Sequence, residues 1–450
     1  MAINNRISPA SGLMSDALRL PSSLSACLFA AALFMSPLSG VRPIPSLSYG
    51  DLLFAISCAC ALAERLANRE QIYFFWIYLL AALLITSSYL VNQFASHGMT
   101  AYEYGQFISA CLDNHVEIVL SQNPNFRTLF TSLIIFPQAF LLQRPRSYGE
   151  VRCLIYIWTM GAIYGAAFTV AYCIGLFDWS DDYFWRVLHR ARGLTGHPNA
   201  MALSTVLAFP GLLLLFFESR NTLLRLAVLV AVFIAWRAIG YSGSRTAIYT
   251  LMAMAAIVFA LLYQQVPAYF RVRLIAATAL IATGYIIFKY AMGPSDHNSA
   301  LWRLENGSAT SDTIRANDHE IATTGFENSP IFGQGFQWLR IAHNMYLQML
   351  HSSGLAGFLG FALAMSYPFY LTLVFWQSIN SLSQRILRSC LLTGALGVLV
   401  WGWAQPNINA LNPTVPFGLL LCLSIIVRAK QLRTRAGRLP DSSELLPRLS

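Results

Sequence analysis

The sequence predicts an all-α, polytopic integral membrane protein, and three observations support this fold class. Hydrophobic residues make up 56% of the 450 positions and charged residues only 11%, which is less charge than a water-soluble protein of this size exposes. Apolar runs of about 17 to 25 residues, the length that crosses a bilayer as a helix, recur along the whole chain. Basic residues concentrate in every second loop between these runs, as expected when the chain crosses the membrane repeatedly.

We expect about twelve transmembrane helices, counted from the apolar runs. The runs are 24–39, 49–65, 72–92, 127–142, 153–175, 197–217, 222–239, 245–264, 272–292, 345–376, 386–403 and 414–428. The first run follows a short stretch that contains arginine, as a signal peptide would. Because Ser36 to Gly40 lacks the small-x-small pattern of a cleavage site, we interpret the run as a retained span.

The basic residues predict that both termini lie in the cytoplasm. With this orientation the cytoplasmic segments contain nineteen of the thirty Lys and Arg residues and seven acidic residues, and the opposite face has eleven basic and thirteen acidic residues. Lys and Arg are retained on the cytoplasmic side of short loops. We therefore read the net charge of +10 as an orientation signal, with membrane lipids and no nucleic acid among the partners.

The predicted organisation has four segments. They are 1–189, with transmembrane helices 1–5; 190–376, with an outer loop at 293–341; 377–428, with the last two transmembrane helices; and 429–450, a basic cytoplasmic tail. The outer loop is the one long polar excursion between spans. Its apolar and turn-forming residues predict short helices on the outer surface. The cysteines show no disulfide framework and no zinc spacing, so we expect no metal site.

Three spans that enter from the outer face begin with a cation or a histidine. Their first residues are His197-Pro198-Asn199, Ser244-Arg245 and His343-Asn344. Pro suits the first helical position and Ser the N-cap. A helix N-terminus already carries partial positive charge, so a cation there is unfavourable unless an anion binds beside it. Three such starts on one face predict a single site for a phosphate or diphosphate at the outer interface.

Each basic residue also has a structural explanation. Arginines near a membrane interface often extend toward lipid phosphates and bind nothing specific. Single histidines such as His189 and His351 are more often hydrogen-bonded structural residues than catalytic ones. Arg303 and Arg340 fit either interpretation, whereas three inverted helix starts together favour a site.

Three segments of the chain resemble the family of O-antigen ligases and Wzy-type polymerases, bacterial membrane glycosyltransferases of the GT-C type. The segments are Arg192 to Ala200, Ser242 to Ala247, and the loop in which Arg315 precedes Asn328 to Gly335, His343 to Leu347 and Gly354 to Gly357. The resemblance covers roughly residues 190–365, and it implies that the segment 190–376 is a catalytic core. The amino-terminal spans are similar in hydropathy alone.

The resemblance implies a GT-C-like enzyme of the bacterial inner membrane with a periplasmic active site. Such proteins take a glycan from an undecaprenyl-diphosphate carrier and use no nucleotide sugar, metal or cofactor. Transfer to lipid A-core, in lipopolysaccharide synthesis, makes a ligase. Transfer to another carrier-linked glycan makes a polymerase, and transfer to Ser or Thr of a protein makes an oligosaccharyltransferase. We prefer the first two.

The resemblance also implies roles for individual residues. Arg245 and Arg315 would bind the diphosphate and stabilise the leaving group, and His343 would be the general base for the acceptor hydroxyl. The expected substrate-binding residues are Arg192, His197, Asn199, Ser244, Asn344 and Tyr346. Asn344 and Tyr346 would support the histidine. The polar residues at 318–320 offer a different base.

A multi-spanning transporter or lipid-linked glycan flippase is the alternative function. Twelve spans with both termini inside are common in transporters. The long loop, however, is off-centre, and the two halves show no matching pairs of broken, charge-bearing helices. Intramembrane charge is also sparse, so the sequence favours the transferase.

Overall fold

The structure is a computed structural model of the chain. It describes residues 23–43, 47–70, 72, 74–94, 126–143, 145, 147–179, 182–219, 221–263, 265–268, 270–276, 279, 300, 303, 309–336, 342–379, 381–405 and 411–436. Within these residues every element is a helix, which confirms the predicted all-α class.

Eight spans of the described chain are long and apolar enough to cross a membrane. They are α4 (Trp76–Phe94), α8 (Tyr148–Cys173), α10 (Pro198–Leu207) continued by α11 (Phe209–Glu218), α12 (Thr222–Ser242), α13 (Arg245–Tyr263), α17 (Met345–Val374), α18 (Leu382–Gly402) and α19 (Leu411–Ala436). A multi-pass membrane protein follows from these helices. Each coincides with one predicted span.

The other four predicted spans are not among these eight helices. Two of them are apolar helices of fewer than 18 residues: α2 (Leu24–Met35), and η2 (Thr131–Ile135) joined to α7 (Phe136–Gln143) after the short α6 (Phe126–Phe130). A third, α3 (Tyr49–Ala67), has 19 residues but includes charged ones and is not among the eight. Most of the range 272–292 lies outside the described residues, so the number twelve stays a prediction.

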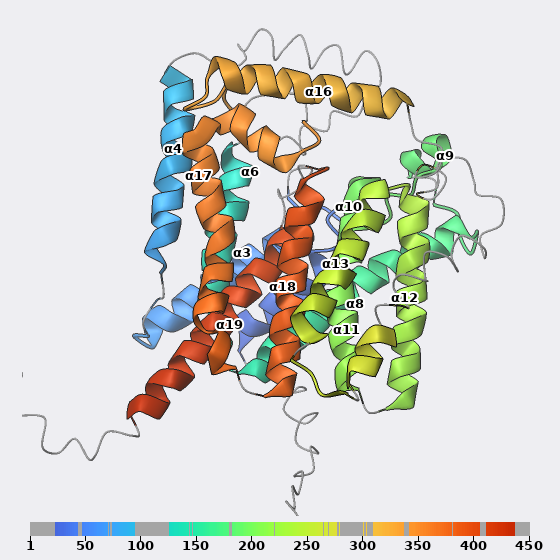
Figure 1. Cartoon of the computed structure of the whole chain (residues 1–450), viewed down its shortest axis with the longest axis vertical. Coiled ribbons are helices and arrows are strands. Elements are labelled where there is room, and N and C mark those ends of the chain that lie inside the picture. Colours follow the sequence, from blue (N-terminus) through green and yellow to red (C-terminus); the bar gives the residue numbers. More distant parts are fainter. Residues whose placement is uncertain are drawn as a thin grey trace, which may run out of the picture.

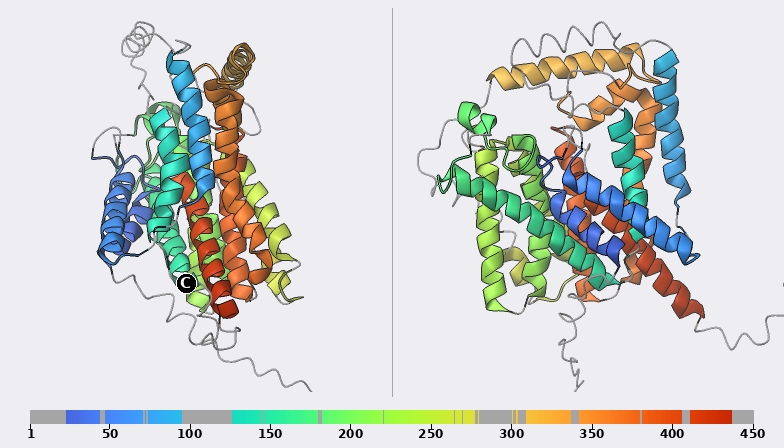
Figure 2. Two further views of the ribbon diagram at one scale, coloured as in Figure 1. Left: turned by 90° about the vertical axis from the view of Figure 1, so that its left-hand side faces the viewer. Right: turned by 180° about the vertical axis from the view of Figure 1, so that it is seen from behind.

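The long helices pack side by side and alternate in direction, so α10, α13 and α17 begin at the same end of the bundle (Figure 1). The helix α16 (Ala309–Asn328) lies across this end, roughly perpendicular to the helices below it. It is a single helix of 20 residues, where the sequence predicted short ones. Seen from behind, α2 and α3 lie together and cross the bundle obliquely, as α8 does (Figure 2).

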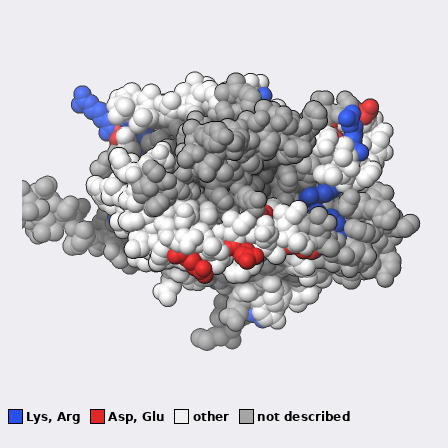
Figure 3. Space-filling model, turned by 90° about the horizontal axis from the view of Figure 1, so that it is seen from above, with Lys and Arg blue, Asp and Glu red and all other residues white. Residues whose placement is uncertain are grey.

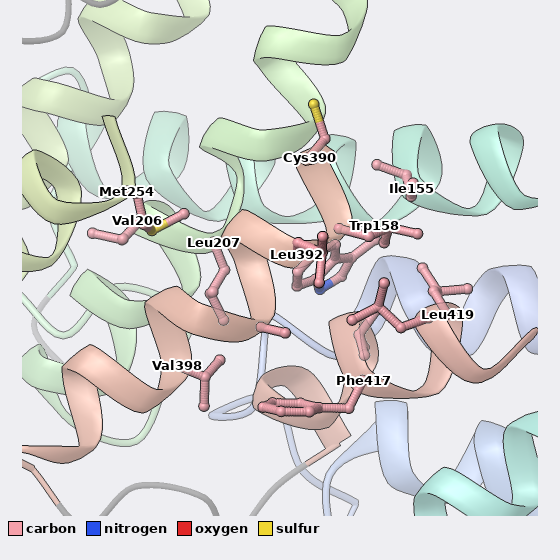
Figure 4. Packing of buried hydrophobic residues seen from close by; sticks show 14 of the residues in the cluster. Ile155, Trp158, Val206, Leu207, Met254, Cys390, Leu392, Val398, Phe417 and Leu419 are labelled. Carbon is pink, nitrogen blue, oxygen red and sulfur yellow. The ribbon is translucent and has the colours of Figure 1, made fainter. Parts of the chain in front are cut away.

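The centre of the bundle is packed with large apolar side chains from α8, α10, α13, α18 and α19 (Figure 4). One polar link runs through this core. The indole Nε1 of Trp158 donates to Asn412 Oδ1 at 2.7 Å, and Asn412 Nδ2 donates to Ser204 Oγ at 3.0 Å. A buried amide is stable when its donors and acceptors are satisfied. The link therefore fixes α19 against α8 and α10.

The helix α17 is broken at Gly354, whose backbone (φ 58°, ψ −163°) is accessible to glycine and strongly unfavourable for other residues. Residues 330–335 cross the break. Four backbone hydrogen bonds hold them there: Gln334 N to His351 O at 2.7 Å, Gly335 N to Ser352 O at 3.0 Å, Leu355 N to Pro330 O at 2.8 Å and Ala356 N to Ile331 O at 2.9 Å. A β-carbon on Gly333 would lie 2.5 Å from the backbone nitrogen of Gly354. Both positions therefore require glycine.

The helix α4 secures this crossing from the side. Ser88 Oγ and Asn92 Nδ2 each donate to the carbonyl oxygen of Phe332 at 2.7 Å. On the other side the ring of His351 lies against Gly325 of α16, with its Nδ1 3.3 Å from Ala322 O. Consequently α16 is held over the bundle by contacts with α17, and α17 by contacts with α4.

Candidate functional site

The start of α10 is built as the sequence predicted, with Pro198 in the first helical position. His197 is the N-cap, and its Nδ1 accepts the backbone N–H of Asn199 at 3.1 Å. The side chain of Asn199 accepts from Arg190 Nη2 at 2.9 Å, and Arg190 Nε donates to Ser242 O at 3.0 Å. Arg190 thereby joins the start of α10 to the end of α12.

The turn between α12 and α13 brings in two more arginines. Gly243 ends α12 in the left-handed region (φ 65°), and its carbonyl accepts from Arg303 Nη1 at 2.9 Å. Arg245 is the first residue of α13. Ser244 does not act as the expected side-chain N-cap. It is buried in this tight turn, where its hydroxyl makes no hydrogen bond within the described chain.

The helix α16 lies over these helix starts and adds four polar side chains. Asp312, Arg315 and Asp318 follow one another at three-residue spacing and His319 lies four residues after Arg315, which gathers them on one side of the helix. Both carboxylate oxygens of Asp312 accept from the guanidinium of Arg245, with 3.2 Å between Nη1 and Oδ2 and a shorter contact between Nη2 and Oδ1. This ion pair connects α16 to α13.

Arg190, Arg245, Arg303 and Arg315 form what we call the arginine cluster. Burial lowers the pKa of Arg190 to about 9, and the positive charges of Arg303 and Arg315 add to the shift. Burial and nearby arginines also lower the pKa of Arg303 and of Arg315. Arg190 lies near enough to Arg303 and Arg315, and Arg245 lies near enough to the same two residues, for their charges to act on one another. Asp312 offsets part of the charge by raising the pKa of Arg303 and Arg315.

The arginine cluster also has hydrogen-bonding capacity to spare. Arg315 Nε is buried and makes no hydrogen bond within the described residues. A buried donor without an acceptor is costly. An anion placed here would meet both the unmatched positive charge and the unused donor.

The backbone at His343 is held in an unusual conformation. His343 has φ 51°, in the left-handed region that non-glycine residues seldom adopt. On one side the backbone N–H of Ala342 donates to Gln348 Oε1 at 2.9 Å. On the other, the side chain of Asn344 caps α17 by accepting from two backbone N–H groups of its first turn. Such strain persists when the surroundings fix it, and it often marks functional sites.

The His343 side chain faces the same cluster of groups. Its Nε2 lies 4.0 Å from Asp318 Oδ2, and its Nδ1 is buried with no hydrogen-bond partner in the described structure. Burial lowers the pKa of His343 to about 4, and the charges of Arg315 and His319 contribute. Burial, Arg190 and His343 lower the pKa of His197 to about 3. Both imidazoles are therefore neutral at pH 7, and His343 has a free lone pair.

Two predicted residues have structural partners elsewhere. Arg192 is held by Asp182, which lies 3.8 Å from its Nε and accepts its backbone N–H at 3.0 Å. The hydroxyl of Tyr346 donates to Leu399 O at 2.7 Å, so this side chain ties α17 to α18. Their expected roles toward substrate and toward His343 stay predictions. Arg340 lies outside the described residues.

The sequence marked Arg190 only as a cation that precedes the helix start at His197. It did not single out Asp312, and it left the roles of Arg303 and Asp318 open. No local pattern marks these residues, because each acquires its role through a partner far away in the chain. Figure 3 looks down on this end, where the visible charged side chains form small separate groups among uncharged residues. The described residues contain no group of three or more metal-ligating side chains.

The arrangement combines an arginine-rich anion site with a neutral imidazole at one end of a helix bundle. Chemically it can bind a multiply charged anion and accept a proton beside it. In comparisons with known proteins, no family model matches this chain and no curated protein shows significant similarity to it.

Proposed function

We propose that this protein is a metal-independent membrane glycosyltransferase that takes a glycan from an undecaprenyl-diphosphate carrier. It transfers the glycan to lipid A-core or to another glycan at the periplasmic face of the bacterial inner membrane. The observation that carries the proposal is the arginine cluster beside the neutral imidazole of His343. The arginine cluster would bind the carrier diphosphate, and the imidazole would take the proton of the acceptor hydroxyl.

The diphosphate matches the arginine cluster in charge and in hydrogen bonding. Arginine binds phosphate oxygens with paired, charge-assisted hydrogen bonds. The first turns of α10 and α13 border the cluster, and helix N-termini favour anions. Donors already oriented toward the leaving group stabilise the charge that develops on it during transfer.

The proposed reaction is a single displacement. The acceptor hydroxyl gives its proton to His343 while its oxygen attacks the anomeric carbon of the donor sugar. The bond from that carbon to the phosphate oxygen breaks, and its electron pair leaves with the carrier diphosphate. Positioned general bases contribute about 10²- to 10⁴-fold to such reactions. No cofactor takes part.

The proposed orientation of the protein in the membrane follows from the basic residues at the end of the bundle opposite α16. There Arg152 lies near the start of α8 and Arg388 near the start of α18. Together with the basic loops and the tail 429–450, they favour that end as the cytoplasmic one. The arginine cluster then faces the periplasm, where carrier-linked glycans are used.

A flippase for the lipid-linked glycan is the second candidate, because α17 is broken at Gly354 and broken helices are typical of transporters. In transporters such breaks line a substrate site near the middle of the membrane. Here the break packs against residues 330–335 and α4. A transport site is therefore the weaker explanation.

Deletion of the gene, with surface polysaccharide analysed on gels, tests the proposal. Long carrier-linked chains that fail to reach lipid A-core mean a ligase, and single-repeat products mean a polymerase. In both cases the donor accumulates on the periplasmic side. Accumulation on the cytoplasmic side alone would establish the flippase and refute the transferase.

A further inference from the structure

The helix α16 places the carboxylate of Asp318 near Nε2 of His343, and the other ring nitrogen, Nδ1, makes no hydrogen bond within the described residues. We propose that Asp318 is a positioning residue that holds the Nε2–H of His343, so that Nδ1 is the atom that takes the proton from the acceptor hydroxyl. This inference rests on the proposed function and adds a residue and an atomic assignment to it.

The geometry distinguishes the two nitrogens of the imidazole. Nε2 lies 4.0 Å from Asp318 Oδ2. Nδ1 is buried and makes no hydrogen bond in the described chain. A neutral imidazole carries one N–H and one lone pair, and the hydrogen bond made by one nitrogen sets the state of the other. A carboxylate accepts and cannot donate when ionised. Asp318 therefore selects the tautomer with hydrogen on Nε2.

Asp318 is itself well placed to act on another group. Its side chain is buried, with 8% of the residue exposed. Asp318 follows Arg315 by three residues on α16, so the Asp318 carboxylate and the Arg315 guanidinium lie on the same side of the helix. A movement of α16 would shift the base and the leaving-group contact together.

The distance of 4.0 Å is longer than a hydrogen bond. Catalytic hydrogen bonds are often long before substrate binds and shorten in the reactive complex. The other charged or titratable groups around His343 are Arg315 and His319 from α16 and His197 at the start of α10. Arg315 and His319 disfavour a protonated His343, so the carboxylate is the group that stabilises the imidazolium formed during transfer.

The reaction step balances without further reactants. The acceptor O–H bond breaks, and its proton moves to His343 Nδ1. The acceptor oxygen bonds to the sugar, and the carrier diphosphate leaves. Asp318 keeps its own charge throughout, as the orienting aspartate of a Ser-His-Asp triad does. It contacts neither substrate nor leaving group, so its effect passes through His343.

Kinetic measurements test the positioning role in purified full-length protein in lipid nanodiscs. The donor is the carrier-linked glycan extracted from the deletion strain, and the acceptor is that strain's lipid A-core. We expect Asp318→Ala to lower kcat about 10- to 100-fold, part of the contribution of a general base, with the KM for donor changed less than about twofold. Asp318→Glu should recover part of the rate. Glu327→Gln, at an exposed site on the same helix, is the matched control and should leave kcat unchanged.

The pH profile separates positioning from folding. In Asp318→Asn the imidazolium loses its carboxylate, so the acid limb of kcat should move to lower pH. A residue needed only for folding would lower the amount of active enzyme without moving that limb. An unchanged limb together with full kcat in Asp318→Ala would overturn the inference.

Nitrogen NMR of histidine-labelled protein tests the tautomer without any substrate. His343→Gln identifies the resonances of His343 by their loss. At pH 7 we expect the Nε2–H tautomer in the native protein and a mixture of tautomers in Asp318→Ala. The Nδ1–H tautomer in the native protein would refute the atomic assignment. If His343→Ala also retains transfer, the proposed function fails; if His343→Ala is inactive and Asp318→Ala is fully active, the positioning role alone fails.

Discussion

Buried arginines lie at both ends of the bundle, and their surroundings differ. At the end opposite α16, Arg152 pairs with Glu218 at 3.1 Å. Arg388 donates from both terminal nitrogens, to Trp376 O at 2.7 Å and to Gln265 Oε1 at 2.9 Å, and its guanidinium lies 3.4 Å from the ring centre of Trp376. In the arginine cluster, by contrast, the carboxylate of Asp312 binds Arg245, and Arg303 and Arg315 lie beside Arg245 with their positive charges.

This difference separates two uses of the same residue. A buried charge that is matched by a carboxylate or stacked on an aromatic ring can hold helices together. A buried charge beside like charges destabilises the empty protein and becomes favourable only when an anion binds. The arginines opposite α16 therefore stabilise the fold, and the arginine cluster suits the proposed anion site.

The largest expected effect is on catalysis, in His343→Asn. Asparagine tolerates a left-handed backbone, so the protein should fold normally while transfer falls about 10²- to 10⁴-fold. His189→Asn is the matched control, since His189 has φ 48°, is exposed and has no role in the proposed reaction. Rates in nanodiscs and thermal unfolding check both variants. Full transfer by His343→Asn would mean that another group is the base.

The comparison between the two ends predicts a large loss of stability for Arg152→Met. The carboxylate of Glu218 accepts hydrogen bonds from Ser383 and Tyr156 and forms its ion pair with Arg152. Removing the arginine leaves the negative charge of Glu218 without a cation. Breaking a buried ion pair from one side costs about 3 to 5 kcal/mol. Unfolding in detergent should show this loss. An unchanged stability would remove the distinction between matched and unmatched arginines.

Arg315→Met should have the opposite outcome. The substitution removes a guanidinium that is repelled by Arg245, so stability should stay the same or rise. Transfer should fall about 10²- to 10³-fold, as when one oriented donor to a developing anion is removed. Transfer rates and unfolding curves, measured on the same preparations of Arg315→Met and of the native protein, test both expectations. A destabilised but active variant would make Arg315 a structural residue.

The protein should become less stable in acid because of two histidines in the candidate site. His343 has a folded-state pKa of about 4 and His197 of about 3, both below the usual 6.5 of an unfolded chain. The unfolded state therefore binds more protons between pH 6.5 and 4, and folding becomes less favourable as pH falls through this window. For His343 the loss is on the order of 1 to 3 kcal/mol. Unfolding at pH 7 and pH 4.5 should show a smaller drop for His343→Asn than for the native protein.

Hydropathy predicted the long helices well because each depends on its own sequence. The run 245–264 became α13 (Arg245–Tyr263), and the run 345–376 became α17 (Met345–Val374). The break at Gly354 could not be predicted in this way. It exists because Gly333, 21 positions earlier, packs directly against it.

The candidate site shows the same division. Cations and histidines at helix starts pointed to Arg245, His197 and His343, and the structure gathers these residues at one end of the bundle. Partners supplied by distant segments gave no local signal. Asp312 balances part of the cluster and Asp182 holds Arg192, and both contacts join residues that sequence spacing does not connect.

The smallest expected effect concerns Asp312, whose carboxylate contacts the arginine cluster through Arg245. Asp312 occupies the guanidinium of Arg245, and its side chain is 47% exposed. A diphosphate must displace this carboxylate or share Arg245 with it. Since an exposed ion pair contributes about 1 kcal/mol or less, Asp312→Asn should tighten binding of a short-chain prenyl diphosphate by about fivefold or less. Glu327→Gln, on the same helix, should leave that affinity unchanged. If Asp312→Asn instead weakens binding, the carboxylate orients Arg245 for the ligand, and the ion pair would then resemble the matched pairs at the opposite end.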